Sequence, residues 1–241
     1  METEEQHDEP ERDRSSVPDQ GRKGRSRSVR LGLSAGSVLA VLLLTSAFIV
    51  QPFLIPSSSM DPTLRVGDRV MVNKLAYRFG DGPRRGDVVV FDGTDSFSGE
   101  ADPDANPVTT ALHKAGASTG LVRPSETDYV KRVVGVGGDR VRCCDRRGRI
   151  EVNGRPVDED YLHPGNAPSA VPFDIRVPEG RLWVMGDYRS RSSDSRDHLG
   201  DPGGGTVPVE RVIGRADWIG WPLGRVGAVP GAPAESGGDD G

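Results

Sequence analysis

The sequence predicts a mainly β domain preceded by one membrane-spanning helix, and three observations support this fold class. Glycine (32 residues) and proline (19) are abundant while aromatic residues make up 5% of the 241 residues, which favours turns and short strands. Valine-rich or alternating runs recur between Gly, Asp and Pro signals, as expected for strands joined by tight turns. Residues 31–50 form an uncharged apolar run, which predicts the helix.

The apolar run, "LGLSAGSVLAVLLLTSAFIV", has the length of a membrane span. At ~1.5 Å per residue it extends about 30 Å, the thickness of the hydrocarbon core. It lacks the polar face of an ordinary core helix, and it is longer than the ~7–15-residue apolar region of a cleaved secretory signal. Residues 21–30 carry basic side chains and no acid, so the positive-inside rule keeps the N-terminus in the cytoplasm. We therefore expect a single-pass signal anchor in the cell membrane.

Composition divides the rest of the chain. Residues 1–30 are charged and poor in large apolar side chains, which predicts a disordered cytoplasmic tail. Residues 226–241 predict a disordered C-terminal tail for the same reason. Between the anchor and this tail, residues 51–225 form the extracytoplasmic β domain, in which the polar segment 92–128 is expected to be a long surface insertion.

Short runs within this domain predict its strands. Three Gly-Asp pairs, at 67–68, 86–87 and 138–139, each stand just before a valine-rich run, where glycine supplies turn dihedrals and aspartate bonds the local backbone. The Asn153-Gly154 pair predicts a tight hairpin turn. The predicted strand segments are "DRVMVNKLAY", "GDVVVFDG", "DYVKRVVGV", "DRVRCC", "RIEVNGRPV" and "RLWVMGD".

The two cysteines, Cys143 and Cys144, are adjacent and therefore too close for an ordinary structural disulfide. We interpret them as two plain thiols, with a strained vicinal bridge or a link to another molecule as the alternatives. Neither CxxC nor Cys/His metal-ligand spacing occurs, so we expect no metal and no cofactor.

The segment "IPSSSMDPTL" places three serines between prolines directly after the apolar run, which suggests a hydroxyl held still for chemistry. A Ser/His/Asp triad would need a histidine, and His198 in "SRDHLG" is the strongest of the four. A lone histidine in a polar loop is usually a surface residue.

Lys131 is a second candidate base, inside the otherwise apolar run "DYVKRVVGV". Strand alternation puts Tyr129, Lys131 and Val133 on one face, with Arg132 on the other. Burial disfavours the ammonium and lowers its pKa toward neutrality, which makes the amine a usable base. The alternative is a lysine on a solvated or edge face that discourages aggregation.

Several segments resemble, in the same order, the boxes of bacterial type I signal peptidases of family S26: "PSSSMDPTL", "GDRVMV", "RGDVVVF", "DYVKRVVGVGGDRV" and "GDYRSRSSDSR". The resemblance covers most of residues 53–222 and follows a membrane span, as in that family. It implies an antiparallel β fold of coiled sheets, related to that of the repressor proteases. It also implies a serine endopeptidase that removes signal peptides from secreted preproteins, cutting after small residues of the Ala-x-Ala type.

The resemblance also implies residue roles. Ser59 matches the nucleophile and Lys131 the general base of a Ser/Lys dyad. Ser57, with the backbone N–H of Ser59, matches the oxyanion hole. Ser192 matches the hydroxyl that orients the lysine amine, and the adjacent Ser193 leaves a one-residue ambiguity.

Further positions follow by the same match. Asp194 and Arg196 match an ion pair that braces their loop, and Asp187 matches a residue that fixes the preceding turn. An extended substrate would add a strand beside "TDYVKR". The positions matching shallow substrate pockets are Phe53, Ile55, Pro56, Met60, Leu64, Val70, Tyr129 and Val130.

The expected partners are secretory preproteins, the lipid bilayer and the protein translocation machinery, and not nucleic acid, since the basic cluster flanks a span. Three alternatives remain at this stage. One is a cytosolic Ser/Lys autoprotease of the repressor-cleaving type, and another is an anchored non-enzymatic β domain that binds peptides or wall components. The third is a relative specialised for particular surface proteins such as pilins.

Overall fold

The computed structural model describes residues 34, 36–38, 49–80, 82–94, 96, 97 and 127–231. The chain divides into two compact units, Met1–Leu44 and Thr45–Gly241. Among the described residues, no helix has both the length and the apolar character needed to cross a membrane. The predicted tail 1–30 and most of the predicted span 31–50 and of the segments 92–128 and 226–241 lie outside these residues.

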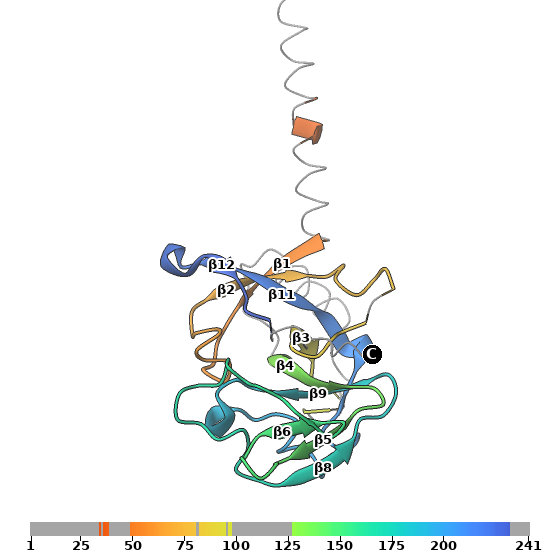
Figure 1. Cartoon of the computed structure of the whole chain (residues 1–241). Coiled ribbons are helices and arrows are strands. Elements are labelled where there is room, and N and C mark those ends of the chain that lie inside the picture. The colour runs from red at the N-terminus through yellow and green to blue at the C-terminus, as the bar shows by residue number, and fades with distance from the viewer. Residues whose placement is uncertain are drawn as a thin grey trace, which may run out of the picture. The chain divides into compact units, whose positions relative to one another are not determined.

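The second unit is built mainly of antiparallel strands (Figure 1), which confirms the mainly β fold class. Its larger sheet has the order β1-β2-β11-β3-β4-β9-β10, and β12 also pairs with β11. These strands are β1 (Val50–Leu54), β2 (Arg69–Asn73), β3 (Val88–Asp92), β4 (Asp128–Val136), β9 (Arg181–Met185), β10 (Val207–Pro208), β11 (Val212–Trp221) and β12 (Gly227–Ala228). The short 3-10 helices are η1 (Arg189–Arg191), η2 (Val209–Arg211) and η3 (Leu223–Arg225).

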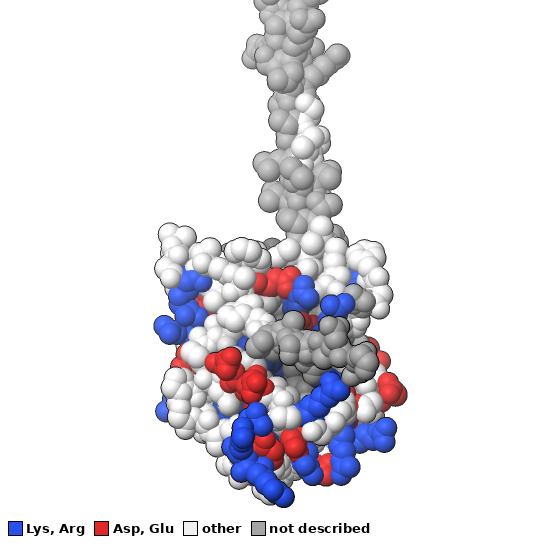
Figure 2. All heavy atoms as spheres, viewed as in Figure 1, with Lys and Arg blue, Asp and Glu red and all other residues white. Residues whose placement is uncertain are grey.

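A smaller sheet follows β4 and has the order β7-β6-β5-β8. It comprises β5 (Arg140–Cys143), β6 (Ile150–Val152), β7 (Arg155–Pro156) and β8 (Phe173–Arg176). Figure 1 shows these strands at one end of the domain. In the same view, Figure 2 shows basic and acidic side chains interspersed at that end. Cross-strand ion pairs belong to this sheet, including Arg140 with Asp174 at 2.6 Å.

The predicted turn chemistry is confirmed at each of the three Gly-Asp pairs. The glycines have positive φ angles of 90°, 88° and 87°, which L side chains rarely adopt. Each aspartate accepts the backbone N–H of the residue three positions earlier, at 2.8 to 2.9 Å. The Asn153-Gly154 pair also has positive φ at both residues (53° and 77°), as the tight turn between β6 and β7 requires.

All six predicted strand segments contain strands, but the domain continues beyond the predicted end at residue 225. Strand β12 pairs with β11 there, and the carbonyl of Pro230 accepts a hydrogen bond from Arg132 Nη1 at 3.0 Å. At the start of the predicted insertion, Phe97 is buried and packs against Phe91 and Tyr129. Packed residues thus continue a few positions past both of these predicted boundaries.

The interpretation of Cys143 and Cys144 as plain thiols is wrong, because the structure joins them in a vicinal disulfide. Their Cα atoms lie 3.0 Å apart, so this is not the ordinary disulfide that the sequence argument excluded. Both residues belong to the apolar cluster of the smaller sheet, together with Ile150 and Phe173.

Candidate active site

The segment after β1 forms a turn that holds Ser59 against the core. Ser59 is 7% exposed, and the side chains of Met60 and Leu64, which follow it, are buried in the apolar cluster beside β1 and β2. The N–H of Leu64 donates to the carbonyl of Met60 at 2.8 Å, and the N–H of Ile55 donates to Asp68 at 2.9 Å. The apolar anchors on both sides therefore fix the backbone that carries the serine.

Ser59 meets Lys131, which lies 72 positions later on β4. Lys131 Nζ and Ser59 Oγ are hydrogen bonded at 2.9 Å, and Lys131 is 4% exposed. Ser57 Oγ lies 3.3 Å from Ser59 Oγ. Within the part of the chain that the structure describes, the backbone N–H of Ser59 has no hydrogen-bond partner. The groups predicted to act as nucleophile, base and oxyanion donors are thus gathered at one point.

Burial changes the acidity of the lysine. Desolvation lowers the pKa of Lys131 from 10.5 to about 8, although the negative charge of Asp194 opposes the shift. At neutral pH a useful fraction of the amine is therefore uncharged and can accept a proton. An ordinary surface lysine would be almost wholly protonated under the same conditions.

A loop after β9 closes over this pair and depends on Gly186. A Cβ at Gly186 would lie 2.5 Å from the carbonyl oxygen of Ser59 and would also collide with the side chain of Ser192. The N–H of Tyr188 donates to the same Ser59 carbonyl at 3.0 Å. Glycine is therefore required because the loop passes directly against the turn that carries Ser59.

Ser192 lies inside this loop and is 7% exposed, whereas Ser193 is exposed. The Ser192 hydroxyl lies beside the Asp194 carboxylate but makes no hydrogen bond of good geometry to any residue that the structure describes. No hydrogen bond joins it to Lys131 in this part of the chain, so the base-orienting role remains a prediction.

Asp194 and Arg196 form a buried ion pair. Arg196 donates to both carboxylate oxygens of Asp194 at 2.8 Å, and the N–H of Gly186 donates to Asp194 Oδ2 at 3.0 Å. Burial alone would raise the pKa of Asp194, but the hydrogen bonds and charge of Arg196 outweigh it and hold that pKa below its ordinary value. The carboxylate is thus ionised and ties the loop backbone at Gly186 to the segment after it.

Sequence reasoning missed the role of Arg132, the neighbour of Lys131 on the opposite face of β4. Its side chain is fully buried and donates to both oxygens of Asp187, at 2.9 and 2.7 Å. Asp187 also accepts from Thr63 Oγ1 at 2.5 Å. This network joins the turn that carries Ser59, strand β4 with Lys131, and the loop after β9. The signal in the sequence was the pair of adjacent cations inside one apolar strand.

The predicted pocket positions fall into different surroundings. Phe53, Ile55, Met60, Leu64 and Val70 are at most 3% exposed in one apolar cluster, against which Val130 packs. Pro56 is exposed just before the serines. Tyr129 instead stacks on Phe91 in a separate cluster. The structure therefore gathers six of the eight positions in or against one cluster and separates Tyr129 from them.

Comparisons with known proteins identify the family. The family described as signal peptidase, peptidase S26, has a model that matches residues 28–221. A probable signal peptidase I of Mycobacterium leprae (strain TN) is 39% identical over 243 residues, which covers 89% of this chain and 83% of that protein. The signal peptidase I of Mycobacterium tuberculosis (strain CDC 1551 / Oshkosh) is 44% identical over 216 residues, covering 80% and 73%. The chain belongs to the S26 signal peptidase family.

A signal peptidase I is also among the solved structures that match. The crystal structure from Enterococcus faecalis V583 has 22% sequence identity and a TM-score of 0.36, and the match covers 56% of this chain and 97% of that one.

Proposed function

We propose that the chain is a membrane-anchored serine endopeptidase that removes N-terminal signal peptides from secreted preproteins, with Ser59 as nucleophile and Lys131 as general base. The observation that carries the proposal is the 2.9 Å contact between Ser59 Oγ and a lysine amine that is 4% exposed. The lowered pKa of Lys131 supplies the neutral form that this chemistry needs.

The reaction follows from the positions of these groups. Neutral Lys131 takes the proton of Ser59 as Oγ attacks the scissile carbonyl, and it then returns that proton to the leaving amine. The Ser57 hydroxyl and the Ser59 N–H stabilise the oxyanion, and such a donor is worth ~2.7–4 kcal/mol in other enzymes. Water, deprotonated by the same amine, then hydrolyses the acyl-enzyme.

Strand β4 offers a place for an extended substrate. Strand β9 pairs with β4 only from Arg132 onward, so Val130 and Lys131 have no strand partner on that side within the described residues. We place the substrate backbone there by strand addition, where the carbonyl to be cut can approach Ser59. Small side chains before the cut, as in Ala-x-Ala, suit a site whose apolar neighbours are closely packed.

We place the enzyme in the cell membrane with its N-terminus in the cytoplasm and its catalytic domain outside. The uncharged run 31–50 and the basic residues before it support this topology. The bilayer and the translocation machinery are the further partners we propose. Protease accessibility of residues 53–222 from outside intact cells tests the topology, and a protected domain would contradict it.

The test of the dyad is cleavage of a preprotein by the purified full-length chain in detergent, with mass spectrometry locating the cut. Wild type should cut after a small residue, and Ser59→Ala and Lys131→Ala should leave the substrate intact. Ser58→Ala is the matched control and should retain activity, because no contact of that half-buried hydroxyl is seen among the described residues. Normal processing by either dyad variant would contradict the assignment of Ser59 and Lys131 as the catalytic dyad.

A further inference from the structure

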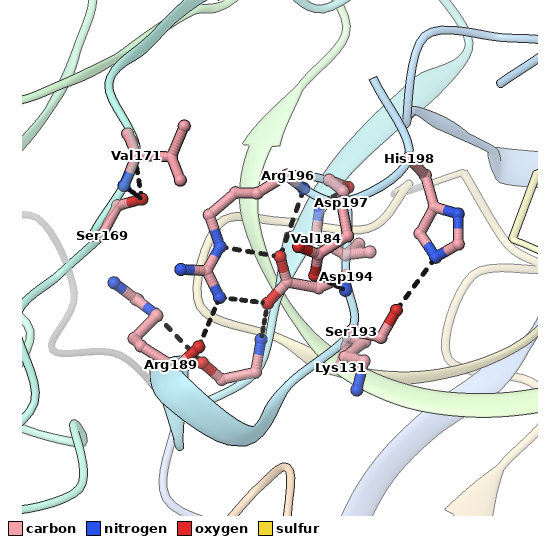
Figure 3. A network of polar contacts seen from close by, with 12 residues as sticks. Lys131, Ser169, Val171, Val184, Arg189, Ser193, Asp194, Arg196, Asp197 and His198 are labelled. Atoms are coloured by element: carbon pink, nitrogen blue, oxygen red, sulfur yellow. Dashed lines mark hydrogen bonds and ion pairs between the residues drawn. The ribbon is translucent and has the colours of Figure 1, made fainter. Parts of the chain in front are cut away.

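Three polar side chains in the segment after β9 are arranged like a second nucleophile with its base. Ser193 Oγ lies 3.1 Å from His198 Nε2, and His198 Nδ1 lies 2.6 Å from Asp201 Oδ2. Figure 3 shows Ser193 and His198 pointing toward each other across their loop. This is the order of contacts, hydroxyl to imidazole to carboxylate, that activates serine in hydrolases.

The carboxylate decides which ring nitrogen of His198 carries the proton. An ionised Asp201 only accepts hydrogen bonds, so a neutral His198 must donate from Nδ1. Nε2 is then the acceptor, and the hydroxyl proton of Ser193 points at it. The neutral imidazole is therefore in the tautomer that can remove a proton from Ser193 Oγ.

Packing holds the imidazole in this position. The ring of His198 stacks on Phe97 with 4.3 Å between centroids and 9° between planes. Phe97 is itself 7% exposed and packs edge-on against Phe91. The N–H of Asp201 donates to the carbonyl of His198 at 3.0 Å, so a local turn keeps the carboxylate beside the ring. A fixed base costs little reorganisation when the reaction begins.

Ser193 is open to a reactant, unlike the buried Ser192 before it. Among the residues that the structure describes, its backbone N–H has no hydrogen-bond partner and is available to an oxyanion. The next residue, Asp194, is fully buried in its ion pair with Arg196, which anchors the backbone beneath the serine. The hydroxyl is therefore accessible while its backbone is held.

We propose that Ser193, His198 and Asp201 form a second reactive-serine site, independent of Lys131, which is acylated by small activated esters. Ser193 Oγ bonds to the acyl carbon as the ester C–O bond breaks, and the hydroxyl proton passes through His198 Nε2 to the leaving alcohol. Water then attacks the acyl-serine, giving its proton to Nε2, and Ser193 recovers a proton as the acid leaves. Small acyl groups are the substrate class because the serine lies at the surface.

The experiment removes the first nucleophile and looks for the second. The full-length Ser59→Ala protein in detergent is treated with a fluorophosphonate probe, which bonds to an activated serine oxygen with loss of fluoride, and peptide mass spectrometry locates the label. We expect labelling at Ser193 and turnover of p-nitrophenyl acetate. Adding His198→Gln, which keeps a polar side chain but no base, should slow both by about 100-fold or more.

Controls separate an activated serine from an exposed one. Ser190 is exposed in the same loop, and no histidine among the described residues contacts its hydroxyl. It should therefore stay unlabelled, and Ser190→Ala should change neither rate. Adding Asp201→Asn should slow labelling about tenfold or more, since the required tautomer is lost. The proposal would be overturned if Ser193 were labelled no faster than Ser190, or if His198→Gln left the labelling unchanged. The hydrogen bond between Ser193 and His198 would then be only structural. Either result is independent of preprotein cleavage by Ser59.

Discussion

Replacing Lys131 with methionine should stabilise the fold at neutral pH while it abolishes catalysis. Burial lowers the pKa of the Lys131 amine to about 8, against 10.5 for an ordinary lysine. A difference of 2.5 pKa units corresponds to about 3 kcal/mol at about 1.36 kcal/mol per unit. Methionine has similar length and no charge, so it removes this cost. The lost hydrogen bond to Ser59 offsets about 1 kcal/mol of the gain.

The stability advantage of Lys131→Met should depend on pH in a definite direction. Because the folded-state pKa of Lys131 is lowered, the unfolded state binds more protons between pH 8 and pH 10.5, and wild-type stability rises with pH across this window. Below pH 8 the full cost is present, and above about pH 10.5 nearly all of it is gone. The stability advantage of Lys131→Met should therefore shrink by about 3 kcal/mol from pH 7 to pH 10.5.

Urea unfolding of the full-length protein in detergent measures this difference, with fluorescence of the fully buried Trp183 as the readout. Comparing the two proteins at each pH cancels the titration of all other groups. Lys74→Met, at a half-buried lysine just after β2, controls for loss of any lysine. A pH-independent difference between wild type and Lys131→Met, or an equal effect of Lys74→Met, would refute the burial argument.

Three further outcomes follow from the site. The kcat/KM of preprotein cleavage should rise about tenfold per pH unit up to about pH 8 and then level off as Lys131 loses its proton; a flat profile from pH 6 to 9 would contradict this. Gly186→Ala should lower the cleavage rate and reduce the free energy of unfolding in urea by about 1–3 kcal/mol, because the added Cβ collides with the Ser59 carbonyl oxygen. Gly224→Ala, which has open space around it, should change neither quantity. Arg132→Met should reduce the free energy of unfolding in urea by about 3–5 kcal/mol, because it leaves Asp187 buried without its arginine partner. An unchanged free energy of unfolding would show that the ion pair is dispensable.

The fold was predictable where local chemistry decides the structure. Valine-rich runs after Gly-Asp turns became strands β2, β3 and β5, because a positive-φ glycine and a backbone-bonding aspartate fix each turn without help from distant residues. Strand β11 was not predicted, since Gly214, Asp217 and Gly220 interrupt its apolar pattern. A Cβ at Gly214 would lie 2.5 Å from the carbonyl oxygen of Asn73 on the neighbouring strand β2. Glycine is therefore required here by the close approach of another strand, which the local sequence does not reveal.

The sequence pointed to two residues that the structure brings into contact, Ser59 and Lys131, but not to their surroundings. Alternation along β4 separates Lys131 from Arg132, but it cannot say which face is covered, and the structure buries both side chains. The sequence also could not say that Ser192 is buried close to Gly186 while Ser193 is exposed. Burial depends on segments far apart in sequence, which periodicity within one strand does not encode.

The arginines around the dyad have an electrostatic consequence as well as a structural one. A neutral Lys131 is difficult to maintain beside acids, since Asp194 and Asp187 both raise its pKa. Each of these two carboxylates is fully buried and is bound by an arginine through both oxygens, Asp194 by Arg196 and Asp187 by Arg132. The charge of Arg196 lowers the pKa of Lys131 and so counters Asp194 directly. The loop can therefore use buried carboxylates to tie its backbone together, while burial still holds the pKa of the Lys131 amine at about 8, below that of an exposed lysine.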